Sequence, residues 1–184
     1  NITDISPLHS QWVNKHAVKS KDDFRLLKQF CKANDLYGAE SYIGGFSGYV
    51  LEILTAHYGY FEKVLISSQK WKEKDVIDPS IFYPTKELAL FHINSSKLQS
   101  PLVVVDPVDK TRNAAAALSM EKFLLFKEAA KKYLQKPAEE FFAKENITID
   151  SLQKKYLGKG TLVFLTVSLA EGKEDVVGAK LLKV

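Results

Sequence analysis

The sequence contains little cysteine, little arginine and no long apolar run. Its single cysteine, Cys31, cannot supply a disulfide framework or a zinc site, which favours a reducing, cytoplasmic location. No segment approaches the ~20 apolar residues of a membrane span, so we expect no membrane partner, and no signal peptide is recognisable. The first residue is Asn1 rather than Met, so we expect the chain to be part of a longer one.

What remains is the composition of a globular protein. The chain has 184 residues, 46% of them hydrophobic and 26% charged, which is enough for one large domain or two small ones. The net charge of +4 permits an anionic partner without requiring one.

Arginine is so scarce that its positions are informative. The only arginines are Arg25 and Arg112, and Arg112 lies in the stretch VVVDPVDKTRNAAAALS. A guanidinium offers a flat fork of five donors that a lysine ammonium cannot imitate. Asp109 is within reach of Arg112 in a turn or helical start, and Asp106 is an equally natural partner. A guanidinium fixed by either carboxylate can present paired donors to a base or a phosphate; the alternative is a surface charge near a helix start.

A second candidate site is the stretch GGFSGYVLEIL. Gly44 and Gly45 allow close backbone approach, and Ser47 can cap the helix that follows. The N-terminus of such a helix favours an anion. Neither the Walker spacing nor G-x-G-x-x-G is present, and a capped helix after a tight turn is the alternative.

Helical periodicity dominates the first three quarters of the chain. It predicts a helical bundle over residues 1–141, with short strands at Val76–Ile77 and Val103–Val105 and a helix after Ser119 that ends before Pro137. The apolar run GTLVFLTVSL then predicts a buried strand, followed by a helix that ends at Val184. One strand and one helix cannot bury each other's faces, so residues 142–184 are expected to begin an incomplete α+β domain.

Metal-binding patterns are absent from the sequence. No acidic pair has the D-x-D arrangement suited to two metal ions, and the histidines have no H-x-x-x-H spacing. The sequence therefore predicts a domain that positions ligands more readily than a self-sufficient catalyst.

Two long motifs carry a resemblance to a known family. YGAESYIGGFSGYVLEILTAHYG and PLVVVDPVDKTRNAAAALS strongly resemble the archaeal CCA-adding enzymes, which are class I tRNA nucleotidyltransferases. SPLHSQWV resembles the T-x-x-H segment of the family, with Ser6 where Thr is usual. GTLVFLTVSL and the helix after it resemble the opening of the third domain of the family, although GAKLLK departs from its aromatic-Pro pair.

The resemblance implies a mainly α fold and an architecture. A helical central domain, like the substrate-binding domain of poly(A) polymerases, would occupy residues 1–141, and the start of a ferredoxin-like α+β body domain would occupy residues 142–184. The catalytic head, which binds Mg²⁺ through carboxylates, and the tail would lie outside this chain. The chain would then hold no catalytic residue and no metal ligand, and we expect it to be inactive alone.

The resemblance also assigns roles to residues. Arg112 would recognise the incoming base, Lys28 and Tyr37 would hold the triphosphate, and Ser6 and His9 would contact the sugar and phosphates. The remaining positions would back the nucleotide or the RNA end (Ser47, Gly48 and Tyr49) or orient Arg112 (Asp106 or Asp109).

The implied substrates are CTP, ATP and tRNA, contacted along its acceptor and TΨC arm. The resemblance also allows a homodimer of the full-length protein. Two alternatives stay open: a non-catalytic RNA-binding module of the same fold, and a nucleotidyltransferase similar to poly(A) polymerase or oligoadenylate synthetase.

Overall fold

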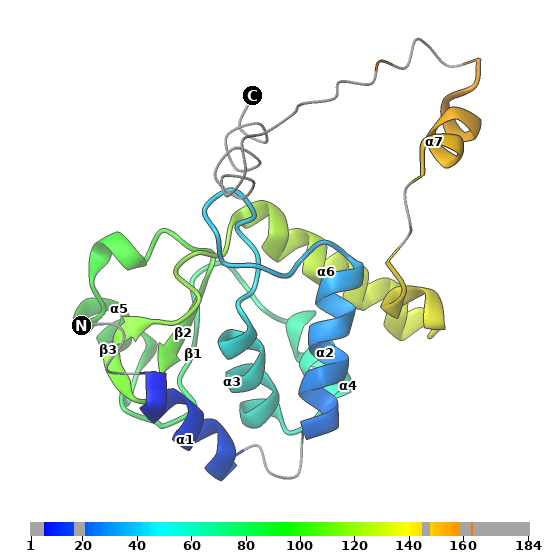
Figure 1. The fold of residues 1–184 in the computed structure, drawn as a ribbon. Helices are drawn as coiled ribbons and strands as arrows, with labels where there is room; N and C mark the ends of the chain where they lie inside the picture. Colours follow the sequence, from blue (N-terminus) through cyan, green and yellow to red (C-terminus); the bar gives the residue numbers. More distant parts are fainter. Residues whose placement is uncertain (1–5, 17–20, 145–147, 159–162, 164–184) are drawn as a thin grey trace. The chain divides into compact units, whose positions relative to one another are not determined.

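The computed structural model describes residues 6–16, 21–144, 148–158 and 163, which belong to two compact units, residues 1–144 and 145–184. The first unit is mainly helical, which confirms the predicted fold class (Figure 1). Its helices are α1 (Ser6–His16), α2 (Lys21–Ala33), α3 (Gly48–Tyr58), α4 (Phe61–Ser68), α5 (Lys86–His92) and α6 (Met120–Gln135), with the 3₁₀ turns η3 (Ser95–Lys97) and η4 (Glu139–Phe142). Its strands are β1 (Asp75–Ile77), β2 (Leu102–Asp106) and β3 (Asp109–Asn113).

Several helix ends follow from local sequence. The Ser47 side chain accepts a hydrogen bond from the Val50 amide at the start of α3, and Ser119 does the same for Lys122 at the start of α6, as predicted. Gly59 ends α3 with φ +102°, a conformation that disfavours any residue with a Cβ.

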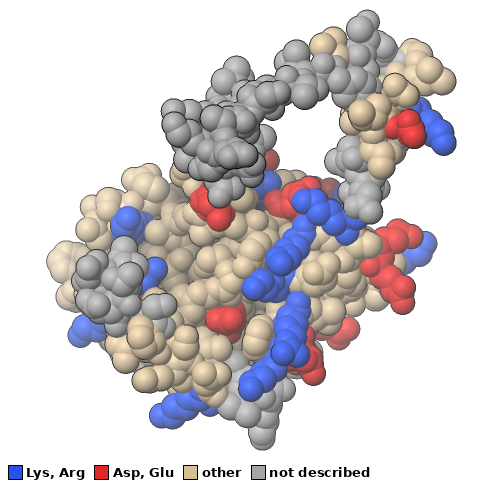
Figure 2. Space-filling view, viewed as in Figure 1, with Lys and Arg blue, Asp and Glu red and all other residues tan. Residues whose placement is uncertain are grey.

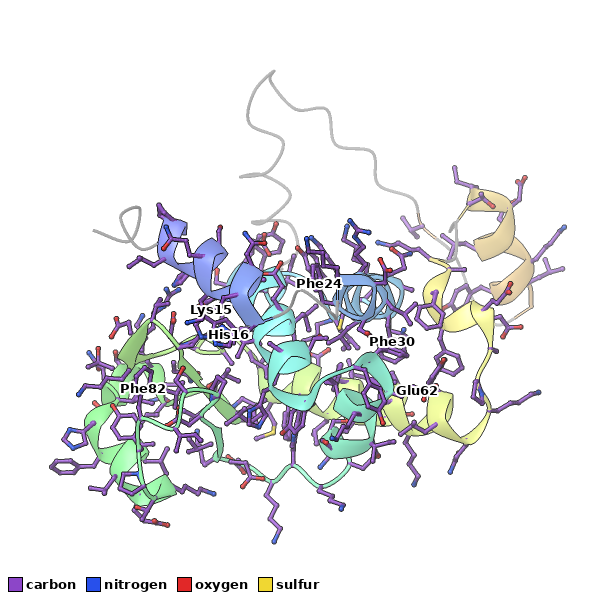
Figure 3. All side chains as sticks on the ribbon, turned by 90° about the horizontal axis from the view of Figure 1, so that it is seen from below. Lys15, His16, Phe24, Phe30, Glu62 and Phe82 are labelled. Carbon is purple, nitrogen blue, oxygen red and sulfur yellow. The ribbon has the colours of Figure 1, made fainter. Side chains whose placement is uncertain are left out.

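The main core of the first unit is aromatic and lies among α2, α3, α4 and α6. Phe30 of α2 is fully buried, and the label in Figure 3 marks where it lies. Five other rings have centroids within 6.2 Å of the Phe30 ring: Phe61, Phe126, Tyr133, Phe141 and Phe142. Because Phe141 and Phe142 belong to η4, the turn after α6 completes this core.

The sheet is mixed, with β2 in the middle. β1 pairs with β2 in parallel and β3 pairs with it antiparallel. Leu102 and Val104 face the main core, whereas Val103 and Val105 join Ile93 in a second core on the other face. This burial on both faces explains the continuous apolar run of β2.

The predicted strands at Val76–Ile77 and Val103–Val105 are confirmed as parts of β1 and β2. The expectation of a turn or helical start around Asp109–Arg112 is wrong, because this polar segment is a strand, β3. Pairing with the buried strand β2 overrides the weak strand propensity of the segment DKTRN.

In the second unit the structure describes α7 (Ile149–Tyr156). The strand predicted over GTLVFLTVSL, apart from Val163, and the last predicted helix lie outside the described residues, so the body domain over residues 142–184 stays a prediction. Among the described helices, none combines the length and the apolar character needed to span a membrane.

Candidate functional site

A buried carboxylate, Asp106, stands at the centre of the candidate site. It ends β2, where Pro107 breaks the buried run, and its side chain is 0% exposed. Its Oδ1 accepts hydrogen bonds from the Tyr49 hydroxyl and from the Val108 amide, both at 3.0 Å. These two bonds fix the plane of the carboxylate and leave Oδ2 directed at other partners.

Oδ2 of Asp106 faces two groups that can carry positive charge. His9 Nε2 lies 3.2 Å away and Arg112 Nη1 lies 3.3 Å away, while these two nitrogens are 3.5 Å from each other. Although both distances are short, no hydrogen bond to Oδ2 has favourable angles among the described residues. The contact is therefore mainly electrostatic, and a buried carboxylate needs such charge nearby to offset its desolvation.

An irregularity in the β2–β3 hairpin places Arg112 at this carboxylate. Val105 pairs with Asn113 and Asp106 pairs with Asp109, so residues 110–112 of β3 lie opposite a single step of β2. A bulge of this kind bends a strand and redirects its side chains. Arg112 thus reaches back to Asp106 while 36% of its side chain stays exposed.

Asp109 has a different set of partners. Its Oδ1 accepts hydrogen bonds from the Thr111 amide at 3.0 Å and from the Thr111 hydroxyl at 2.7 Å. Asp109 therefore stabilises the hairpin turn, whereas Asp106 makes the ion pair with Arg112. The sequence left both carboxylates open as partners, and the structure pairs Arg112 with Asp106.

His9 connects α1 to this site through Tyr49 of α3. The His9 and Tyr49 rings are stacked with centroids 4.0 Å apart. Burial raises the pKa of the Tyr49 hydroxyl, and the charge of Asp106 together with their hydrogen bond raises it further. Tyr49 therefore remains a neutral donor to Asp106 at physiological pH. Ser6 begins α1, and its side chain lies outside the described residues.

The glycine-rich loop before α3 is packed tightly against the rest of the unit. Gly45 lies so close to the chain that a Cβ there would stand 2.3 Å from the carbonyl oxygen of Leu36. The loop is held by backbone hydrogen bonds from Phe46 to Leu36 at 2.8 Å and from Ser119 to Gly44 at 2.8 Å. The first of these bonds brings Tyr37 next to the start of α3.

Lys28, Tyr37 and Gly48 form a second group at that helix start. The Lys28 ammonium lies 5.3 Å from the centroid of the Tyr37 ring. A Cβ on Gly48 would lie 3.2 Å from the Tyr37 hydroxyl and 3.9 Å from Lys28 Nζ. Burial raises the pKa of nearby Glu52, and the charge of Lys28 opposes that rise. This arrangement places a cation and a phenol beside the amides of a helix N-terminus, which suits an anion.

The structure therefore gathers seven of the predicted residues into two adjoining groups. One comprises His9, Tyr49, Asp106 and Arg112, and the other comprises Lys28, Tyr37 and Gly48. The first turn of α3 joins them, because Gly48 and Tyr49 are consecutive and Ser47 caps that turn.

Sequence reasoning missed Asn113, which holds the end of β3. Its side-chain oxygen accepts from the amides of Val104 at 2.9 Å and Ala115 at 3.0 Å, and its amide group donates to Lys97 and Ser100. Asn113 is 2% exposed and is next to Arg112, so it anchors the backbone that carries the guanidinium. A lone Asn beside an alanine run gives no sequence signal for this role.

In the part of the chain that the structure describes, acidic and histidine side chains do not gather elsewhere in a way that suits a metal ion. Across residues 6–16, 21–144 and 148–158, no three of the His, Cys, Asp and Glu side chains are placed to hold one. Asp106 and His9 are close to each other, but Arg112 occupies the remaining side of the carboxylate. The described residues therefore do not fit a metal site.

Comparison with known proteins gives this geometry a context. Residues 22–143 match the family model described as tRNA nucleotidyltransferase, second domain. The chain is 39% identical over 180 residues to the CCA-adding enzyme of Nanoarchaeum equitans, covering 98% of this chain and 43% of that protein. It is 38% identical to the CCA-adding enzymes of Saccharolobus islandicus and Thermococcus kodakarensis, covering 95% of this chain and 38% and 39% of those proteins. The chain thus spans about two fifths of the length of these relatives.

Proposed function

This chain belongs to the family of tRNA nucleotidyltransferase second domains, and we propose that it is the central part of an enzyme that adds CCA to the 3′ end of tRNA. The names of its relatives support this activity, and CTP, ATP and tRNA are then the substrates. In this proposal the chain selects and positions the nucleotide, and parts of the protein beyond it contribute the remaining groups. In-line phosphoryl transfer depends mainly on such positioning and on charge stabilisation, which makes a separate positioning domain effective.

The observation that carries the proposal is the ion pair between Arg112 and the buried Asp106. Nη1 of the Arg112 guanidinium faces Asp106, and 36% of the side chain remains exposed. The other donors of the guanidinium can therefore meet a ligand in a fixed orientation. Cytosine and adenine present planar sets of hydrogen-bonding groups, and paired donors discriminate among such edges. We propose that Arg112 recognises the incoming base and that Asp106 orients it.

The second group of the site accounts for the rest of the nucleotide. We propose that Lys28 and Tyr37 hold the triphosphate beside the N-terminus of α3, and that His9 contacts the sugar and phosphates together with Ser6. Gly48 would leave room for a phosphate beside the Tyr37 hydroxyl, because a Cβ at this position would lie 3.2 Å from that hydroxyl and occupy the space. Ser47 and Tyr49 would support that turn from behind.

The partners beyond the nucleotide are part of the same proposal. We propose that the body domain contacts the acceptor and TΨC arm of tRNA, that the full-length protein works in the cytoplasm, and that it can form a homodimer. Mg²⁺ is the proposed metal of the full-length enzyme, where it would supply charge neutralisation of the phosphates. Because the described residues do not fit a metal site, its ligands would come from another part of the protein.

The test is nucleotide incorporation onto tRNA that lacks CCA. The full-length protein containing this chain is expected to add C, C and A in order, and the 184-residue chain alone is expected to add nothing. Addition of A without dependence on CTP would instead indicate a poly(A) polymerase-like enzyme. Tight RNA binding by the full-length protein with no incorporation of any nucleotide would indicate a non-catalytic RNA-binding module. Either result would overturn the proposal.

A further inference from the structure

Basic side chains line one face of α2. Lys21, Arg25, Lys28 and Lys32 follow each other at intervals of four, three and four residues, which places them on one side of a helix. Figure 2 shows basic side chains running across the face of the molecule where Figure 1 places α2. A row of this kind is ordinarily a solvated surface, so the contacts of its members decide whether any part of it is a site.

The two halves of this basic face differ in their acidic neighbours. In the first half, Arg25 Nη1 pairs with Asp22 Oδ1 at 3.1 Å, and Asp23 accepts a hydrogen bond from the Phe61 amide. In the second half, no carboxylate within the described part of the chain lies at salt-bridge distance from Lys28 or Lys32, although Glu52 lies near enough to Lys28 for the Lys28 charge to lower its pKa. The acidic residue that follows α2, Asp35, pairs with Lys144 instead.

Lys28 and Lys32 converge on one aromatic ring. Each ammonium lies 5.3 Å from the centroid of Tyr37, Lys28 half-buried and Lys32 exposed. The ring attracts both cations through its quadrupole, while the two like charges repel each other. An anion with charge spread over more than one phosphate would relieve that repulsion by contacting both ammonium groups.

We propose that Lys32 is a second phosphate-binding cation, which acts with Lys28 across Tyr37 to hold the β- and γ-phosphates of the incoming nucleotide. This inference rests on the proposed function, because it places the triphosphate beside Lys28 and Gly48. Lysines bind phosphate as point charges, so two of them on adjacent turns can share one polyphosphate. Lys32 would then add affinity for the triphosphate tail and take no part in choosing the base.

The test compares Lys32→Gln, Lys32→Arg and Lys28→Gln with a control, Lys21→Gln, in the full-length protein. Lys21 lies on the same face of the same helix, beyond the pair formed by Arg25 and Asp22. Lys32→Gln is expected to raise the KM for both CTP and ATP about tenfold with kcat unchanged, which corresponds to ~1.4 kcal/mol. Lys32→Arg should retain most of the affinity, and Lys21→Gln should match the wild type.

A binding measurement checks the same point without turnover. Titration of the full-length protein with inorganic tripolyphosphate, followed by nuclear magnetic resonance, should shift the side-chain signals of both Lys28 and Lys32, and Lys32→Gln should weaken that binding. A loss of triphosphate affinity in Lys28→Gln with none in Lys32→Gln would overturn this inference and leave the proposed function standing. A higher KM for tRNA rather than for nucleotide in Lys32→Gln would also overturn it, since the basic face would then bind RNA. If neither lysine affected triphosphate binding, the proposed role of Lys28 would fall as well.

Discussion

Replacing Asp106 by Asn should separate the charge of this side chain from its size. The amide oxygen of Asn can still accept hydrogen bonds from the Tyr49 hydroxyl and the Val108 amide, which now bind Oδ1. Its NH₂ group would then face His9 Nε2 and Arg112 Nη1, where the native carboxylate oxygen lies 3.2 and 3.3 Å away. A donor would thus replace an anion in front of the guanidinium, and Arg112 would lose the group that fixes its plane.

The size of this effect follows from the contact that Arg112 is proposed to make. A bidentate contact to a base is worth about 1–3 kcal/mol, so its loss should lower kcat/KM for CTP and ATP roughly ten- to a hundredfold. Asp106→Asn should also lower the free energy of unfolding by about 1–3 kcal/mol. This loss is smaller than for a fully buried ion pair, because Arg112 remains partly exposed and can be hydrated. The assay is steady-state incorporation by the full-length protein, with thermal unfolding measured in parallel.

Asp109→Asn is the matched control for this prediction. It removes a carboxylate three residues from Arg112 in the sequence, but Asp109 contacts Thr111 and not the guanidinium. Its effect on nucleotide use should therefore be small. A variant Asp106→Asn that remained folded and kept wild-type kcat/KM, while Asp109→Asn lost activity, would refute the assignment of Asp106 as the orienting carboxylate.

Two further predictions concern stability. Gly45→Ala should lower the free energy of unfolding by at least about 1–3 kcal/mol, because its Cβ would meet the backbone of Leu36. Gly48→Ala should lower it less, because its Cβ would meet the ends of movable side chains. Equal melting temperatures for the two variants would contradict this packing argument. Glu52→Gln should raise the melting temperature at neutral pH, because burial disfavours the charged carboxylate and raises its pKa. A carboxyl whose folded pKa is raised costs stability above that pKa, so the advantage of Gln should vanish as the pH falls below the ordinary pKa of Glu. Thermal unfolding from neutral to acidic pH measures this, and an advantage that grows at acidic pH would show that Glu52 is stabilised in its charged form.

The parts of the fold set by local sequence could be predicted. Ser47 and Ser119 were recognisable as helix caps because a side-chain oxygen in the right place satisfies the first free amides of a helix. The strand at Val103–Val105 was recognisable from its apolar run. By contrast, β3 is polar and forms because it pairs with β2, a tertiary fact that its own residues do not encode.

The geometry of the candidate site was less accessible from the sequence. Arg112 was singled out by its rarity, but the choice between Asp106 and Asp109 depends on an irregular strand register that no spacing rule specifies. The approach of Lys32 to Tyr37 depends on how the loop after α2 returns to that helix. The stacking of His9 on Tyr49 likewise joins two residues that are 40 positions apart in the sequence.

The nucleotide selectivity of the Arg112→Lys variant tests the central proposal most directly. The substitution keeps the positive charge near Asp106 and removes the paired planar donors. The measurement is steady-state incorporation of CTP, ATP, GTP and UTP by the full-length protein onto tRNA ending before the first C, before the second C and before the A. Base recognition by Arg112 predicts a ten- to hundredfold lower kcat/KM for CTP and ATP, weaker rejection of GTP and UTP, and unchanged tRNA binding. Wild-type rates for CTP and ATP together with full rejection of GTP and UTP would show that Arg112 does not recognise the base.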